Sequence, residues 1–256
     1  MSEEDRQQPA TPDLSIVVPA YKEAQRIGPT LEALRDYIAA SAARCELIVV
    51  DDGSRDGTVD VVRRFAAEGL VLRLLVNPAN RGKGYSVRQG MLAAAGKVLL
   101  MCDADLSAPI SEAGKLLAWL ERGYDVVVGS RDMPDSVLDP PQPLLRRLLA
   151  WGFRALRRRL LLPDLLDTQC GFKCFRREVA RAVFSRAKVD GWLFDCEALG
   201  IADRLGSRIK EVGVVWRNHP DSRVRVWREA LTALPRLLSI RRRLSRLKDL
   251  PAGGET

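Results

Sequence analysis

Two aspartates separated by a single residue follow an apolar stretch near the middle of the chain. They form the triplet Asp103-Ala104-Asp105, which comes directly after residues 98–102. Carboxylates on alternate residues at the end of a strand can both reach one hard divalent cation, and Mg²⁺ or Mn²⁺ held in this way can bridge them to a diphosphate. A solvated turn would show the same short pattern. The surrounding residues therefore decide whether Asp103 and Asp105 are metal ligands.

A second pair of acids and a basic loop occupy comparable places in the sequence. Asp51 and Asp52 end another apolar run, where a carboxylate can accept a hydrogen bond from the N–H of a nucleotide base. Turn and capping chemistry is the alternative for this segment. The loop at residues 80–84, with Lys83 between two glycines, precedes a helical pattern and suits an anionic group, although it lacks the spacing of a P-loop. Acids and a basic loop together favour a nucleotide diphosphate held through a metal ion.

The elements that must position these residues alternate regularly along the chain. Apolar runs rich in Val, Ile and Leu indicate buried parallel strands at residues 14–19, 46–50, 70–76, 97–101 and 124–128. Helical patterns lie between them, at residues 24–43, 58–68, 85–95 and 111–122. The alternation predicts an α/β fold with a Rossmann-like, mostly parallel sheet sandwiched by helices. In such sheets ligands bind beyond the carboxyl ends of the strands, which is where the acids and the basic loop fall.

Composition limits the class of protein. The chain has 256 residues, 46% hydrophobic and 29% charged, so it can bury one sizeable core and is neither disordered nor a disulfide scaffold. Its five cysteines are interpreted as buried thiols in a reducing cytosol. A single histidine leaves few ligands for a structural zinc ion. The acidic start is unlike a signal peptide, and because no apolar stretch is long enough, no transmembrane helix is expected.

The net charge of +8 is concentrated in two segments. Residues 142–162 carry six arginines and no acid, and residues 223–248 carry nine bases and one acid. Leucines recur at helical spacing in both, so each segment is predicted to be a basic amphipathic helix, with Pro235 kinking the second or starting another helix. We predict that these helices contact an anionic membrane surface. Ordinary surface helices, or a contact in a homo-oligomer, are the alternatives.

Five motifs in order resemble those of family-2 glycosyltransferases with the A-type nucleotide-sugar fold. These motifs lie at residues 17–23, 51–54, 80–84, 103–105 and 129–131. Three later segments are similar to the dolichyl-phosphate β-glucosyltransferase branch of that family, namely residues 167–173, residues 191–197, and Trp216 with Ser222-Arg223. The resemblance covers about residues 13–240. It implies the A-type fold and a nucleotide-sugar donor, to which the two amphipathic helices would be peripheral additions.

The resemblance also implies roles for individual residues. The donor would be bound by residues at the strand ends, namely Pro19, Ala20, Tyr21, Glu23, Asp52, Lys83, Asp103 and Ala104. Asp103 and Asp105 would hold Mg²⁺ or Mn²⁺, and Ser107 stands where related mannosyltransferases have a glutamine that helps to bind the metal. The candidate catalytic residues are Asp105, Arg131 and Arg223. Candidates for binding the acceptor are Arg131, Arg147, Ser222 and Arg223.

The implied reaction is the inverting transfer of a sugar, glucose from UDP-glucose, to polyprenyl or dolichyl phosphate at the membrane surface. A phosphate monoester is mostly dianionic at pH 7, so it needs arginines to position it more than it needs a base. GDP-mannose is the alternative donor. A basic nucleic-acid-binding module is the alternative of another class. Leucines rather than stacking aromatics accompany the arginines, however, so no nucleic-acid partner is expected.

The expected organisation is one enzyme domain with basic helical additions. Residues 1–12 are expected to be a disordered N-terminal segment. Residues 13–222 form the nucleotide-sugar transferase domain, which includes the amphipathic helix near 144–162. Residues 223–256 form basic amphipathic C-terminal helices and a tail. The enzyme is expected to be cytoplasmic and peripheral on the cytoplasmic face of the membrane.

Overall fold

The computed structural model describes residues 11–139, 144–217 and 226–247, and it describes side chains in these ranges except at 144–150 and 226–232. Some sequence predictions lie outside this description. They concern almost all of the N-terminal segment 1–12, Ser222, Arg223 and the side chain of Arg147.

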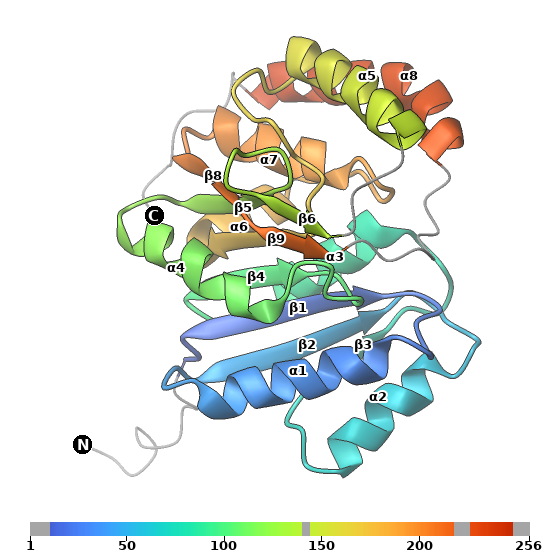
Figure 1. Cartoon of the computed structure of the whole chain (residues 1–256), viewed down its shortest axis with the longest axis vertical. Coiled ribbons are helices and arrows are strands. Elements are labelled where there is room, and N and C mark those ends of the chain that lie inside the picture. The colour runs from blue at the N-terminus through green and yellow to red at the C-terminus, as the bar shows by residue number, and fades with distance from the viewer. Residues whose placement is uncertain (1–10, 140–143, 218–225, 248–256) are drawn as a thin grey trace.

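A seven-stranded sheet forms the centre of the described structure (Figure 1). The strand order is β3-β2-β1-β4-β7-β5-β8. The strands are β1 (Leu14–Ala20), β2 (Cys45–Asp51), β3 (Arg73–Val76), β4 (Val98–Cys102), β5 (Val126–Ser130), β7 (Phe172–Arg176) and β8 (Ile209–Gly213). Only β7 runs antiparallel to its neighbours in this sheet, and the other pairs are parallel. The predicted α/β fold with a mostly parallel sheet is confirmed.

Helices cover both faces of the sheet, and each face has its own hydrophobic core. Ile16 and Val18 belong to the core under α1 (Ile27–Ala40), α2 (Thr58–Ala67) and α4 (Ala113–Glu121). Val17 belongs to the opposite core, under α3 (Lys83–Ala93), α6 (Arg177–Phe184) and α7 (Phe194–Arg204). Successive side chains of a strand point to opposite faces. A strand covered on both sides is therefore apolar throughout, which explains the continuous runs in the sequence.

Two long basic helices lie together at one end of the molecule, at the top of Figure 1. They are α5 (Leu144–Leu160) and α8 (Val226–Arg246), which contact each other, and α8 also contacts α7. Leu237 and Ile240 of α8 are buried in the core of the α7 face. Both predicted amphipathic helices therefore form, and the apolar stripe of α8 packs against the protein. None of the helices in the described ranges is long and apolar enough to cross a bilayer.

The structure differs from the sequence predictions in three details of the fold. The strand expected at 70–76 is shorter, because only Arg73–Val76 pairs with β2. Pro235 lies inside α8, so of the two outcomes expected at this proline, a second helix does not occur in the described part of the segment. Its core contacts on both sides of the proline hold the helix together despite the missing N–H. Strands β7 and β8 were not predicted, nor was the small parallel sheet of β6 (Val137–Asp139) and β9 (Val215–Arg217).

Candidate active site

The carboxyl ends of three parallel strands bring the predicted donor residues to one edge of the sheet. In the register of β1 and β2, Pro19 lies opposite Val50 and Ala20 opposite Asp51. On the other side of β1, Val17 pairs with Met101 of β4, two residues before Asp103. The structure therefore places Ala20, Asp52 and Asp103 at a common edge, as expected for parallel strands. Their roles in donor binding stay predictions.

Lys83, the first residue of α3, forms an ion pair at this edge. Its Nζ lies 2.5 Å from Asp103 Oδ1 and 5.0 Å from the centroid of the Trp192 ring. Burial disfavours the charge on Lys83, but the carboxylates of Asp103 and Asp195 outweigh burial and raise its pKa. The side chain is thus a cation at neutral pH, at the place where the sequence predicts a diphosphate.

Asp105 lies two residues beyond Asp103 and is half-buried. Its Oδ1 accepts hydrogen bonds from Ser107 N, at 3.0 Å, and from Ser107 Oγ, at 2.9 Å. The described residues contain no cluster of three or more His, Cys, Asp or Glu side chains that could hold a metal ion. A Mg²⁺ site needs only one or two carboxylates when phosphate oxygens and water complete the shell. Asp103 and Asp105 supply carboxylates of the kind that such an ion takes, and the metal site itself stays a prediction.

Asp52 shapes the basic loop, a role that the sequence did not reveal. Its two oxygens accept four hydrogen bonds, from Asn77 Nδ2 at 2.9 Å, Asn80 Nδ2 at 2.8 Å, Arg81 N at 2.9 Å and Gly82 N at 2.8 Å. A carboxylate with so many donors fixes the path of the loop that leads into Lys83. The asparagines at 77 and 80 were the signal for this role. A contact between Asp52 and the donor stays a prediction.

The segment after β1 is tied to the loop after β2. Lys22 N donates to Ser54 Oγ at 2.8 Å, and Glu23 N donates to Thr58 Oγ1 at 2.8 Å. Lys22 has a positive φ of 58°, which turns the chain sharply after Tyr21. The Glu23 carboxylate accepts two hydrogen bonds from the Arg26 guanidinium, at 2.7 and 2.6 Å. These bonds hold Tyr21 and Glu23 at the edge where the donor base and ribose are predicted.

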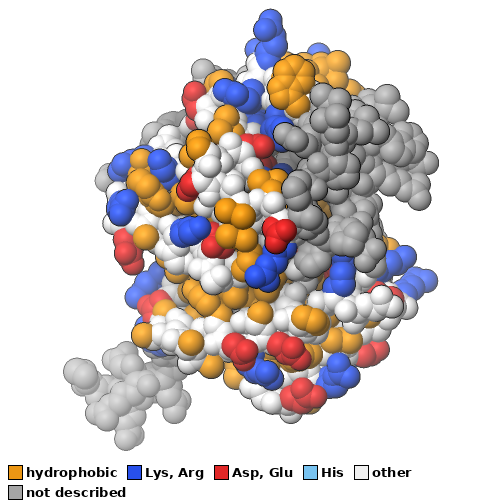
Figure 2. Space-filling view, in the orientation of Figure 1, with side chains coloured by type: hydrophobic (Ala, Val, Ile, Leu, Met, Phe, Trp, Pro, Cys, Tyr) orange, Lys and Arg blue, Asp and Glu red, His pale blue; other side chains and the backbone are white. Residues whose placement is uncertain are grey.

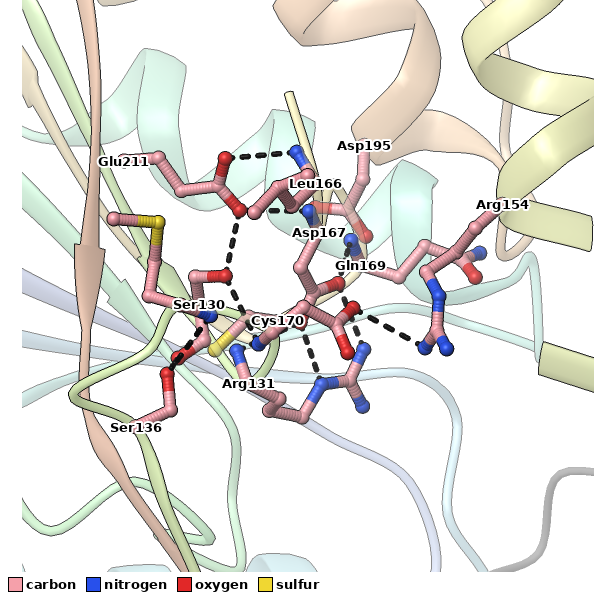
Figure 3. A network of polar contacts seen from close by, with 12 residues as sticks. Ser130, Arg131, Ser136, Arg154, Leu166, Asp167, Gln169, Cys170, Asp195 and Glu211 are labelled. Atoms are coloured by element: carbon pink, nitrogen blue, oxygen red, sulfur yellow. Dashed lines mark hydrogen bonds and ion pairs between the residues drawn. The ribbon is translucent and has the colours of Figure 1, made fainter. Parts of the chain in front are cut away.

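Arg131 follows β5 and forms a bidentate ion pair with Asp167 (Figure 3). Arg131 Nε lies 2.6 Å from Asp167 Oδ2, and Arg131 Nη2 lies 2.9 Å from Asp167 Oδ1. The guanidinium also lies over the Trp216 ring, 4.9 Å from its centroid. Burial would raise the pKa of Asp167, but the charge of Arg131 and its hydrogen bonds outweigh burial and lower it. Both groups are therefore charged at neutral pH, and Arg131 is held in one orientation.

A further carboxylate supports the segment that carries Asp167. Glu211 of β8 accepts hydrogen bonds from Leu166 N at 2.8 Å, Asp167 N at 2.7 Å and Ser130 Oγ at 2.6 Å. Ser130 directly precedes Arg131, so Glu211 links the backbone on both sides of the Arg131–Asp167 pair (Figure 3). Sequence reasoning missed both Asp167 as the partner of Arg131 and Glu211 as its support.

A buried ion pair lies between the two parts of the site. Lys173 Nζ of β7 is 2.6 Å from Asp195 Oδ1 of α7, and it also donates to the carbonyl oxygen of Cys170. Burial raises the pKa of Asp195, and the charges of Lys173 and Lys83 oppose this shift. Burial also raises the pKa of Cys196 to about 11, so this thiol stays protonated at neutral pH. A lysine inside an apolar strand was the sequence signal for the pair.

Comparisons with known proteins show which family the chain resembles. The family model described as "Glycosyl transferase family 2" matches residues 15–184. A dolichyl-phosphate β-glucosyltransferase of Trichomonas vaginalis is 36% identical over 222 residues, which cover 83% of this chain and 66% of that protein. One of Drosophila melanogaster is 36% identical over 219 residues, covering 80% of this chain and 67% of that protein.

The fold is shared with a solved enzyme of Mycobacterium tuberculosis, glucosyl-3-phosphoglycerate synthase in complex with Mn²⁺ and UDP-glucose. The TM-score is 0.66 at 21% identity, and the match covers 90% of this chain and 79% of that one. This likeness supports the A-type arrangement of sheet and helices. The present chain spans about two thirds of the length of the curated relatives named above. On the match of the family model to residues 15–184, the chain belongs to glycosyl transferase family 2.

Proposed function

We propose that the protein transfers glucose from UDP-glucose to a dolichyl or polyprenyl phosphate with inversion at the anomeric carbon. The observation that carries the proposal is the sheet edge at which the Asp103–Lys83 pair and Asp105 lie two strands from Arg131. Adjacent strands are separated by about 4.8 Å, so the ends of β4 and β5, with β7 between them, are about 10 Å apart, a span that a sugar and a phosphate can fill. The dolichyl-phosphate β-glucosyltransferases that share a third of its sequence support the choice of acceptor.

Asp103 and Asp105 would hold Mg²⁺ or Mn²⁺ together with the donor diphosphate. A bound ion supplies a positive charge that stabilises the departing nucleotide diphosphate. Lys83 adds a second fixed cation beside Asp103. The structural relative with Mn²⁺ and UDP-glucose supports this assignment. Ser107, whose hydroxyl bonds Asp105, holds that carboxylate in place at the edge of the site.

Arg131 would position the phosphate of the acceptor. Its guanidinium has five N–H donors, of which the bidentate contact to Asp167 uses two, so the rest can bind a phosphate. A phosphate monoester with a second pKa near 6 is already dianionic at pH 7 and can attack the anomeric carbon without a general base. Glu197 is unsuited to be a base, because its oxygens accept hydrogen bonds from Lys188 N, Val189 N and Arg243.

We also propose that α5 and α8 bring the enzyme to an anionic membrane surface, on the cytoplasmic side. Trp151 is 67% exposed on α5, and Leu234 is 47% exposed on α8. Basic and hydrophobic side chains occur together at this end of the molecule in Figure 2. A basic helix with exposed apolar residues binds the interface of an anionic bilayer. This placement would present the lipid acceptor to the sheet edge.

The proposed reaction can be tested with a panel of radiolabelled nucleotide sugars. The protein is incubated with each sugar, Mg²⁺ or Mn²⁺, and a short polyprenyl phosphate, and the label that enters the organic phase is counted. We expect label from UDP-glucose, and its loss with a chelator or in Asp105→Ala. If only GDP-mannose delivers label to the organic phase, the donor is GDP-mannose and not UDP-glucose. Full transfer by a metal-free Asp105→Ala variant would contradict the metal assignment.

A further inference from the structure

Two arginines of α5 bind the segments that lead to Arg131 and to its partner Asp167. Arg154 lies 3.1 Å from Asp132, which is the residue after Arg131. One turn further along the helix, Arg157 is fully buried. The sequence analysis predicted a basic amphipathic helix here and did not single out either arginine. The described part of α5 therefore has an inward-facing pair of charges.

Arg157 binds the backbone that leads to Asp167. Its guanidinium donates to the carbonyl oxygens of Leu162 at 3.0 Å, Leu165 at 2.6 Å and Leu166 at 2.7 Å. Burial lowers its pKa, and Nε has no hydrogen-bond partner among the described residues. A buried guanidinium is costly unless its contacts are well formed. The three hydrogen bonds to carbonyl oxygens of residues 162–166 offset that cost and hold this loop in one conformation.

Two chains of contacts, one on each side of Arg131, connect this residue to α5. Arg157 fixes the loop that ends at Asp167, and Asp167 binds Arg131 through two side-chain bonds. Arg154 fixes Asp132, the next residue after Arg131 in the chain. Glu211 joins the loop to Ser130 on the other side of Arg131. The position of the Arg131 guanidinium therefore depends on the position of α5.

We propose that Arg154 and Arg157 are positioning residues that set the orientation of Arg131 toward the acceptor phosphate. This inference rests on the proposed function, in which Arg131 binds that phosphate. Neither arginine touches the donor edge at Asp103 in the described contacts. Loss of either one should therefore weaken the use of the acceptor and spare the use of the donor. A purely structural role for α5 would affect both substrates alike.

The test is Arg157→Lys, with Arg158→Lys as its matched control. Arg158 is exposed and donates a single hydrogen bond, at 2.9 Å, to the Pro163 carbonyl. Lysine keeps the charge but cannot reach three carbonyls as a planar fork does. We expect the KM for polyprenyl phosphate to rise about tenfold in Arg157→Lys, because a factor of this size corresponds to the loss of one charged hydrogen bond. The KM for UDP-glucose should stay within about twofold of the wild-type value. Arg158→Lys should match the wild type.

A second pair of variants covers the case in which Arg157→Lys does not fold. Arg154→Gln and Asp132→Asn each break the ion pair between Arg154 and Asp132. Each single variant should raise the KM for the acceptor by the same factor as the double variant Arg154→Gln/Asp132→Asn. An equal rise in both KM values, or additive effects of the two substitutions, would overturn the proposal.

Amide hydrogen exchange gives a readout that does not require transfer. The amides of Leu166, Asp167 and Gln169 donate to Glu211 or to the Asp167 carboxylate. We expect them to exchange faster in Arg157→Lys and at the wild-type rate in Arg158→Lys. Unchanged exchange in Arg157→Lys would overturn the proposal. If these amides exchange faster in Arg157→Lys than in the wild type, but the wild type transfers no sugar to any acceptor, then the proposed function is wrong. The contacts by which α5 positions Arg131 would still be supported.

Discussion

The Cα of Gly171 lies against the carboxylate of Asp103. A Cβ atom added at Gly171 would overlap both Asp103 oxygens, and Asp103 N donates to the Gly171 carbonyl at 3.1 Å. The backbone just before β7 and the acid just after β4 are therefore in direct contact. A side chain at position 171 must push the carboxylate away, because it meets the mobile end of Asp103 and not a backbone atom. Asp103 can therefore keep its orientation only because residue 171 has no Cβ atom.

We predict that Gly171→Ala lowers transfer at least about 100-fold, since a displaced ligand loses most of the metal's stabilisation of the leaving group. The free energy of unfolding should fall by only about 1–3 kcal/mol, as expected for overpacking. Steady-state kinetics and urea unfolding measure the two quantities. Gly114→Ala on α4 is the control, because an added Cβ there has nothing within 4 Å. Full activity in Gly171→Ala would contradict the role of Asp103.

The residue spacing identified some members of the site and could not identify others. Asp103, Asp105 and Lys83 stand in short local motifs whose chemistry is readable from type and order. Asp195 comes from a segment about 90 residues later, so only the fold brings it near Lys83. Arg157 has the same sequence surroundings as the exposed Arg158. Helical periodicity predicts on which face of the helix a residue lies. It does not show that the carbonyl oxygens of residues 162–166 need a hydrogen-bond donor.

At the scale of elements, the start of β1 is tied to both neighbouring strands by one acid. Asp13 Oδ1 lies 2.8 Å from Lys97 Nζ beside β4, and Asp13 Oδ2 accepts from Arg44 N before β2 at 3.1 Å. The bond to Lys97 and the bonds to Arg44 lower the pKa of Asp13 from 3.8 to about 2. The folded chain therefore binds this proton less readily than the unfolded chain does.

The sign of the resulting pH dependence follows from the lowered pKa of Asp13. Its stabilising contribution is present above pH 3.8 and is lost as the pH falls through about 2. We predict that an NMR titration gives a pKa near 2 for Asp13, and that Lys97→Met moves this pKa upward because the first cause of the shift is removed. A pKa of 3.8 for Asp13 in the wild type would show that its contacts with Lys97 and Arg44 are absent in solution.

The strands that the sequence did not reveal are short or carry charges. β8 (Ile209–Gly213) contains Lys210 and Glu211, and β7 contains Lys173. Apolar periodicity detects a strand only where both faces are covered by hydrophobic side chains. Here buried charges are tolerated because each has a partner, as Lys173 has in Asp195. The first half of the fold was therefore predictable, and the strands that carry the polar networks were not.

The helix α8 is held by a stripe of buried apolar residues across Pro235. Leu237 is fully buried in this stripe, whereas Leu234 is 47% exposed. We predict that Leu237→Ala costs about 2–5 kcal/mol of unfolding free energy, the usual cost of a large-to-small change in a core. Leu234→Ala should stay within about 0.5 kcal/mol, as surface substitutions do. Urea unfolding measures both. Equal effects would show that α8 is not docked on α7.

At the scale of the whole molecule, the two basic helices lie together at one end, and Trp151, Leu234 and Leu238 are exposed on them. The helices α5 and α8 lie at the top of Figure 1, and α2 lies at the opposite end. Trp151 and Arg159 are exposed on α5. Because Arg154, Arg157 and Arg158 bind other groups of the protein, Arg159 remains for an anionic surface. This division predicts that membrane binding and acceptor positioning can be separated by mutation.

We predict that the full chain sediments with vesicles containing anionic lipid, less so as salt rises, and not with neutral vesicles. Arg159→Glu should lower the partition coefficient about thirtyfold, because each charge near the surface contributes about 1 kcal/mol and the substitution removes a positive charge and adds a negative one, about 2 kcal/mol in all. Arg63→Glu on α2 changes the net charge equally and should have little effect. Equal losses in the two variants would mean that net charge alone drives binding, and wild-type protein left in the supernatant would refute the membrane proposal.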